Sequence, residues 1–179
     1  MATRVLTINR APVLTLWAAV VAQRLGFDWN EALSLGKALA GLNAQSKGRR
    51  LGIFKPHEEK ARKAREKEPG EVFWVELCGR AIPAANTNEG VRAVLRGNPI
   101  NPAGVLRYLE AKFDESLGPV RSAMTKLARA YKPSELAEEA YGLYERFRPT
   151  IPGGKKGWGA SGELDLESIV NLASDRVRK

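Results

Sequence analysis

Two apolar segments near the start of the chain follow a helical period. From Pro12 to Leu25 (PVLTLWAAVVAQRL) almost every position is apolar, which predicts a helix buried on nearly all sides. Gly26 ends it. A second helix is predicted from Trp29 to Ala44, where apolar residues recur every three or four positions. Asp28 followed by Glu31 suits a variant of the capping box at its start. The two helices together predict an N-terminal helical hairpin.

Small residues interrupt the second predicted helix at Gly36, Ala40 and Gly41. Each glycine lowers intrinsic helix stability by up to about 1 kcal/mol, so their presence calls for a compensating contact. A close approach of another backbone would supply it. That backbone is either the first helix of the hairpin or a second copy of the chain.

The middle of the chain changes to a strand pattern. Glu71 to Leu77 (EVFWVEL) is short, rich in β-branched and aromatic residues and bounded by turn residues, which predicts a strand. A turn at Cys78–Ala81 would lead into a second strand over Ile82–Ala85. Pro83 has no N–H to donate, so we expect that second strand to lie at an edge. The prediction is a short central β-hairpin.

The rest of the chain is predicted to be helical. A short helix fits Glu89–Arg96, and longer amphipathic helices begin near Asn101-Pro102, Pro119, Ser134 and Leu166. The fold class expected from the whole sequence is mainly α, with an N-terminal helical hairpin, a short central β-hairpin and a C-terminal helical bundle. No run of 18 apolar residues is present, so we expect no membrane span.

Positive charge is concentrated in the first part of the chain. Residues 1–70 contain 13 Lys and Arg against 6 Asp and Glu, a net charge of +7, whereas residues 71–179 have a net charge of only +2. Pro69-Gly70 follows a highly charged segment and marks the expected boundary between a basic helical-hairpin region with its linker, 1–70, and the β-hairpin plus helical bundle, 71–179. The two regions could also form one compact domain. Cations concentrated beside a folded core favour a polyanionic partner, and nucleic acid is the commonest.

Three cations follow the hairpin in a glycine-containing segment. Lys47, Arg49 and Arg50 lie around Gly48, and no acidic residue occurs between Glu31 and Glu58. Arginine binds phosphate oxygens in pairs, and flanking glycine lets backbone amides approach a ligand. We predict that these three cations bind nucleic-acid phosphates. The alternative is a solvated loop whose charges balance acids elsewhere.

Two further segments could extend this surface. Arg62 and Lys63 lie in a run of cations diluted by glutamates, which favours a solvated helix or linker. Lys155 and Lys156 precede Trp158 in a glycine-rich loop, where the lysines could hold phosphate while the indole stacks on a base. The alternative for Trp158 is an anchor that folds back onto the protein.

The hairpin resembles the helix-turn-helix of many repressors between Val21 and Lys37. Ala22 and Gly26 have the spacing of the small residue and the turn glycine of that motif. An ordinary helical hairpin needs the same spacing and is the favoured interpretation. Asp28 and Glu31 would also repel phosphates at the turns where a recognition helix reads bases. If this segment meets DNA, we expect it to act as a scaffold.

Residues for catalysis are scarce. Cys78 is the only cysteine and His57 the only histidine, so disulfides, histidine–cysteine metal sites and catalytic triads are not expected. Phosphate-binding glycine motifs for nucleotides are absent. We therefore expect no enzyme activity, no cofactor and no metal. The single cysteine and the absence of an apolar stretch in Met1–Asn9 favour a cytoplasmic protein.

The function predicted from the sequence is non-catalytic binding of nucleic acid. Duplex DNA is the first choice, held through phosphate contacts with little readout of base sequence. The alternative is a protein-interaction or homo-oligomerisation module, a homodimer being the simplest case, that uses the apolar hairpin with Trp17 and Trp29 at the interface. A third, weaker hypothesis is an enzyme that acts on a phosphorylated substrate through the same cations.

Overall fold

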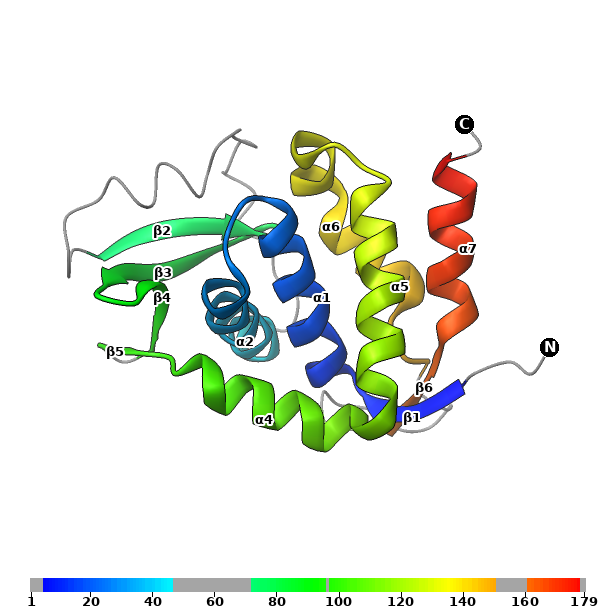
Figure 1. Ribbon diagram of the computed structural model, residues 1–179, viewed down its shortest axis with the longest axis horizontal. Helices are drawn as coiled ribbons and strands as arrows, with labels where there is room; N and C mark the ends of the chain where they lie inside the picture. Colours follow the sequence, from blue (N-terminus) through cyan, green and yellow to red (C-terminus); the bar gives the residue numbers. More distant parts are fainter. Residues whose placement is uncertain (1–4, 47–71, 96, 151–160, 178–179) are drawn as a thin grey trace.

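The helical hairpin lies between a sheet and a group of helices. A computed structural model of the chain describes residues 5–46, 72–95, 97–150 and 161–177. Figure 1 shows the larger sheet at one end, helices α1 and α2 in the middle, and α5, α6 and α7 at the other end, with α4 running along one side. Residues before and after position 70 share one hydrophobic core. No helix in the described ranges is long and apolar enough to cross a membrane.

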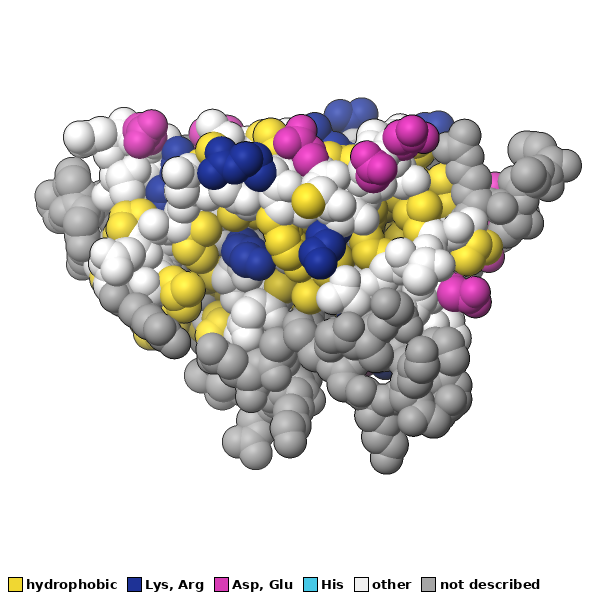
Figure 2. All heavy atoms as spheres, turned by 90° about the horizontal axis from the view of Figure 1, so that it is seen from below, with side chains coloured by type: hydrophobic (Ala, Val, Ile, Leu, Met, Phe, Trp, Pro, Cys, Tyr) yellow, Lys and Arg dark blue, Asp and Glu magenta, His cyan; other side chains and the backbone are white. Residues whose placement is uncertain are grey.

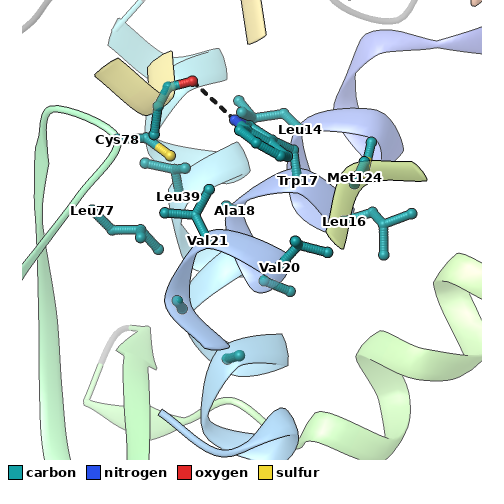
Figure 3. Close-up of a cluster of buried hydrophobic side chains, with 14 of the residues drawn as sticks. Leu14, Leu16, Trp17, Ala18, Val20, Val21, Leu39, Leu77, Cys78 and Met124 are labelled. Atoms are coloured by element: carbon teal, nitrogen blue, oxygen red, sulfur yellow. Dashed lines mark hydrogen bonds between the residues drawn. The ribbon is translucent and has the colours of Figure 1, made fainter. Parts of the chain in front are cut away.

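Helix α1, Arg10–Arg24, is the centre of this core, as its composition predicts. All side chains from Pro12 to Ala22 are buried. Figure 3 shows α1 side chains meeting Leu39 of α2, Leu77 of the sheet and Met124 of α5. Trp17 is fully buried, and its Nε1 donates a hydrogen bond of 2.9 Å to the carbonyl of Ala140 (Figure 3). The buried indole therefore keeps its one polar group satisfied.

Helix α2, Trp29–Ser46, begins with the predicted capping box. The Asp28 N–H donates to Glu31 Oε1 at 2.9 Å, and the Glu31 N–H donates to Asp28 Oδ1 at 2.8 Å. Gly36 faces α1 so closely that a Cβ placed on it would lie 2.5 Å from the Thr15 carbonyl oxygen. The close backbone approach expected from the small residues is therefore made within the chain, against α1.

The larger sheet overturns the expectation of a mainly α fold with one short β-hairpin. It is antiparallel, with four strands in the order β2-β3-β4-β5. The strands are β2, Val72–Leu77, β3, Arg80–Thr87, β4, Gly90–Leu95, and β5, Asn98–Pro99. A turn joins β2 to β3 where the sequence predicted one, but it is shorter than Cys78–Ala81: only Cys78 and Gly79 form it, both with positive φ, and Arg80 and Ala81 already belong to β3.

Strand β4 occupies the segment Glu89–Arg96 that the sequence predicted as a short helix. Gly90 has a φ of +116°, which a helix does not allow, and this residue turns the chain back along β3. Helix α2 covers the other side of β4: Glu31 Oε2 accepts from the Val91 N–H at 2.8 Å, and Ser34 Oγ accepts from the Ala93 N–H at 3.1 Å. Two buried side chains of α2 thus bind the free edge of β4 at Val91 and Ala93, ahead of the short pairing of Val94 and Leu95 with β5, and this stabilises β4 against a helix.

Strand β3 lies between β2 and β4, so the expectation that Pro83 marks an edge strand is wrong for the strand as a whole. The pairing of β3 with β4 runs from Ala84 to Thr87, whereas Pro83 pairs only with Trp74 of β2. The missing N–H of Pro83 therefore interrupts no hydrogen bond to β4.

A second, smaller sheet was not predicted. Strand β1, Val5–Asn9, pairs antiparallel with β6, Ser161–Asp165, so that Val5 lies opposite Asp165 and Asn9 opposite Ser161. Val5–Asn9 (VLTIN) is rich in β-branched residues, but Ser161–Asp165 (SGELD) has no strand pattern of its own. Their pairing brings the start of the described chain next to the start of the last helix.

The predicted C-terminal helices are confirmed. They are α4, Pro102–Phe113, α5, Leu117–Arg129, α6, Pro133–Phe147, and α7, Leu166–Val177, and a short 3₁₀ turn, Asp114–Ser116, joins α4 to α5. Asn101 caps α4 by accepting a hydrogen bond from the Ala103 N–H at 2.9 Å. The apolar faces of these helices pack against the hairpin and complete the core.

Candidate nucleic-acid interface

The residues predicted to bind nucleic acid lie outside the described part of the chain. These are Lys47, Arg49, Arg50, Arg62, Lys63, Lys155, Lys156 and Trp158. Their roles stay predictions. The described residues contain a different set of cations, and these can be placed.

Helix α2 is not available as a recognition helix. All side chains from Glu31 to Gly36 are buried, and Glu31 and Ser34 are engaged with the backbone of β4. A helix that reads bases must offer its first turns to the major groove. The resemblance to a repressor motif therefore reduces to an ordinary helical hairpin, the interpretation that the sequence favoured.

A basic groove, here called the α1–α5 groove, runs between helices α1 and α5, which lie side by side in Figure 1. Its volume is about 720 Å³. Four cations line it: Arg24 from α1, and Arg121, Lys126 and Arg129 from α5. The remaining lining residues are neutral, so no carboxylate of the lining balances this charge. Such a groove attracts anions, because its positive field is not cancelled at short range.

One wall of the groove holds an arginine stacked on an aromatic ring. The Arg121 guanidinium carbon lies 3.6 Å from the centre of the Trp29 ring. Burial lowers the pKa of Arg121 from its ordinary value, but an arginine starts so high that it stays protonated at neutral pH. Trp29, expected as an interface tryptophan, is half-buried beneath this guanidinium.

The groove continues into a second basic pocket of about 440 Å³. Arg24 and Arg129 line both, and Lys132 and Arg176 extend the cationic lining. Arg24 Nη2 donates to the carbonyl of Tyr131 at 3.0 Å, while no described atom accepts a hydrogen bond from its buried Nε. Glu135 is the only carboxylate of the second pocket.

Glu135 is itself held by two donors. Its Oε1 accepts from the Lys132 N–H at 2.9 Å, and its Oε2 accepts from Arg176 Nη2 at 2.7 Å. These hydrogen bonds, the backbone one first, lower the pKa of Glu135. Arg176 also lies over the Tyr131 ring, 4.4 Å from its centre. This end of the basic surface is therefore partly neutralised, whereas the α1–α5 groove is not.

Three of the arginines lie at helix ends. Arg24, Arg129 and Arg176 belong to the last turns of α1, α5 and α7, where a cation offsets the negative end of the helix dipole. The sequence shows this local preference, but it does not show that three helix ends meet. The pocket that Arg24, Arg129 and Arg176 share is a result of tertiary packing.

Cations elsewhere are more dispersed. On the face seen from below in Figure 2, Lys and Arg side chains lie among hydrophobic and acidic ones. Lys37 of α2 lies 3.8 Å from the centre of the Tyr108 ring, and burial, with a smaller effect of Lys112, lowers the pKa of Lys37. Arg107 and Lys112 are exposed on α4. They provide a comparison for the groove cations.

The alternative function used the hairpin as an oligomer interface. Trp17 is fully buried within the chain, and the close contact at Gly36 is made to α1. Gly41 is exposed, and a Cβ placed on it would meet nothing within 4 Å. An oligomerisation module stays a prediction, but Trp17 and Gly36 cannot form its interface in this fold.

The described residues offer few groups for metal binding or for nucleophilic catalysis. They hold no group of three His, Cys, Asp or Glu side chains that could bind a metal ion. Cys78 is buried in the β2–β3 turn. Searches for a matching protein-family model, a similar curated protein and a similar solved structure found no match to this chain.

Proposed function

We propose that this protein is a non-catalytic nucleic-acid-binding protein that holds duplex DNA through phosphate contacts in the α1–α5 groove, with little readout of base sequence. The observation that carries the proposal is the lining of that groove: four cations and no carboxylate. The net charge of +9 for the whole chain points the same way.

The groove cations suit a phosphate backbone better than base edges. Lys126 and Arg129 are exposed on one helix, and Arg24 is fixed by its hydrogen bond to Tyr131. Phosphate contacts position a protein on nucleic acid without reading its sequence. A sequence-independent contact of this kind needs concentrated positive charge, which the groove offers. We further propose a cytoplasmic location, which the single cysteine supports.

A salt titration with matched variants tests the proposal. One double variant, Lys126→Gln/Arg129→Gln, removes two groove cations. The control, Arg107→Gln/Lys112→Gln, removes one arginine and one lysine that are also exposed, on α4. Affinity for a fluorescent DNA duplex is measured by anisotropy from low to physiological salt, with single-stranded DNA and duplex RNA in parallel.

The groove variant should bind more weakly at every salt concentration. If both cations contact phosphate, the slope of log K against log salt becomes shallower by about 1.8, which is 0.9 for each lost contact. The control should keep the slope of the natural protein within error. Equal effects of the two double variants would show that only net charge matters and would refute the groove. Absence of binding to any nucleic acid at low salt would refute the function.

A further inference from the structure

We propose that Arg121 is the phosphate anchor of the α1–α5 groove and that Trp29 is its positioning residue, so that the site takes a linear chain of phosphates and not a single anion. The inference deepens the proposed function and rests on it for the class of ligand.

The contact with Trp29 holds the guanidinium, and within the described residues its donors are left available for a ligand. The guanidinium carbon of Arg121 lies over the indole, 3.6 Å from the ring centre. Its N–H groups donate no hydrogen bond to another described residue. An arginine held in this way loses less side-chain entropy on binding and can offer two parallel hydrogen bonds to one phosphate. A lysine ammonium has no planar group to stack on the ring and cannot offer two parallel hydrogen bonds.

The other cations of α5 set the length of the ligand. Arg121 and Arg129 both line the groove. They are eight residues apart in α5, so their backbone positions are about 12 Å apart along the helix axis. Thr125 lies between them and also lines the groove. Arg24 faces the Arg129 end, since both line the second pocket as well. Two anchor positions this far apart on the helix favour a chain of phosphates over a single phosphate.

A structural role alone would also explain a stack between α2 and α5. If Arg121 only held these helices together, its replacement would change the free energy of unfolding but not the affinity of a folded protein for phosphate. The two roles are therefore separated by a binding measurement on variants whose folding is verified by circular dichroism.

The experiment uses the full chain and two probes, a short DNA duplex and sodium tripolyphosphate. The variants are Arg121→Lys, which keeps the charge, Trp29→Leu, which removes the platform, and Trp29→Tyr, which keeps an aromatic ring. Arg107→Lys on α4 is the matched control. Affinity is followed by calorimetry, and tryptophan emission reports on the environment of Trp29.

We expect Arg121→Lys to weaken binding of both probes about tenfold, the effect of losing one charge-assisted hydrogen bond. Trp29→Leu should weaken binding as well, and Trp29→Tyr should restore it while abolishing most of the emission change. Arg107→Lys should bind like the natural protein. Binding of duplex that Arg121→Lys leaves unchanged would overturn the anchor and leave the function standing.

The two proposals can fail separately. Arg121-dependent binding of tripolyphosphate without binding of DNA or RNA would support the phosphate site and refute the nucleic-acid function. Equal affinity for tripolyphosphate and inorganic phosphate would refute the linear-chain ligand. Absence of binding to all probes would refute both.

Discussion

Replacement of Gly36 by alanine should destabilise this protein, although alanine is the better helix former. A Cβ at position 36 would lie 2.5 Å from the Thr15 carbonyl oxygen and 3.0 Å from the Ala19 backbone nitrogen. Ordinary contacts begin at 3.4 Å, so α1 and α2 must separate by about 0.9 Å. Both opposing atoms are backbone atoms of α1, which cannot rotate away as a side chain would.

The expected magnitude combines two opposing effects. Forcing an extra methyl group into a packed core costs roughly 1–3 kcal/mol, and the rigid opposing backbone favours the upper end of that range. The better helix propensity of alanine returns up to about 1 kcal/mol. The net loss in the free energy of unfolding is therefore about 2 kcal/mol, equivalent to a fall in Tm of roughly 4–8 °C for a chain of this size.

The same helix supplies a control of opposite sign. Gly41 is exposed, and its added Cβ would meet nothing within 4 Å, so Gly41→Ala should stabilise the protein by up to about 1 kcal/mol. Urea denaturation followed by circular dichroism at 222 nm measures both variants. Equal changes for Gly36→Ala and Gly41→Ala would mean that the two helices do not approach as closely as described, and the reasoning would be wrong.

Two further changes test other contacts. Ser34→Ala removes the acceptor of a buried β4 amide, so the free energy of unfolding should fall by roughly 1–3 kcal/mol and that amide should exchange faster with deuterium; a change within about 0.5 kcal/mol would contradict it. Glu135→Gln should lower stability at pH 7, because the folded protein holds the pKa of Glu135 below its ordinary value of 4.5. That contribution is present above pH 4.5 and is lost as the pH falls through the folded pKa, so urea midpoints of variant and natural protein should converge at lower pH. A gap that persists in acid would refute this assignment.

The candidate interface could be predicted from the sequence only as a class. The excess of cations is a property of composition, so it does not depend on how the chain folds. The α1–α5 groove is different, because Arg24 and Arg129 are more than one hundred residues apart and meet only when α1 packs beside α5. The stack of Arg121 on Trp29 joins two helices in the same way. Short-range sequence patterns contain no information on such pairs.

The sequence by itself determined the helices that bury a wide apolar face. Helix α1 is apolar on almost all sides and α2, α4, α5, α6 and α7 carry apolar residues at helical spacing, so local periodicity and burial favour the same conformation. The capping residues Asp28 and Asn101 act within a few positions of their partners, and for that reason they could also be recognised.

Only the tertiary structure decided the strands that depend on distant partners. Residues 90–95 form β4 because β3 pairs on one side, while on the other Glu31 and Ser34 of α2 accept two of its N–H groups and β5 pairs with its end. Strand β1 exists through its pairing with β6, more than 150 residues away. A strand satisfies none of its backbone groups within itself, whereas a helix satisfies most of its own. The identity of a short strand is therefore set by whatever the folded chain places beside it.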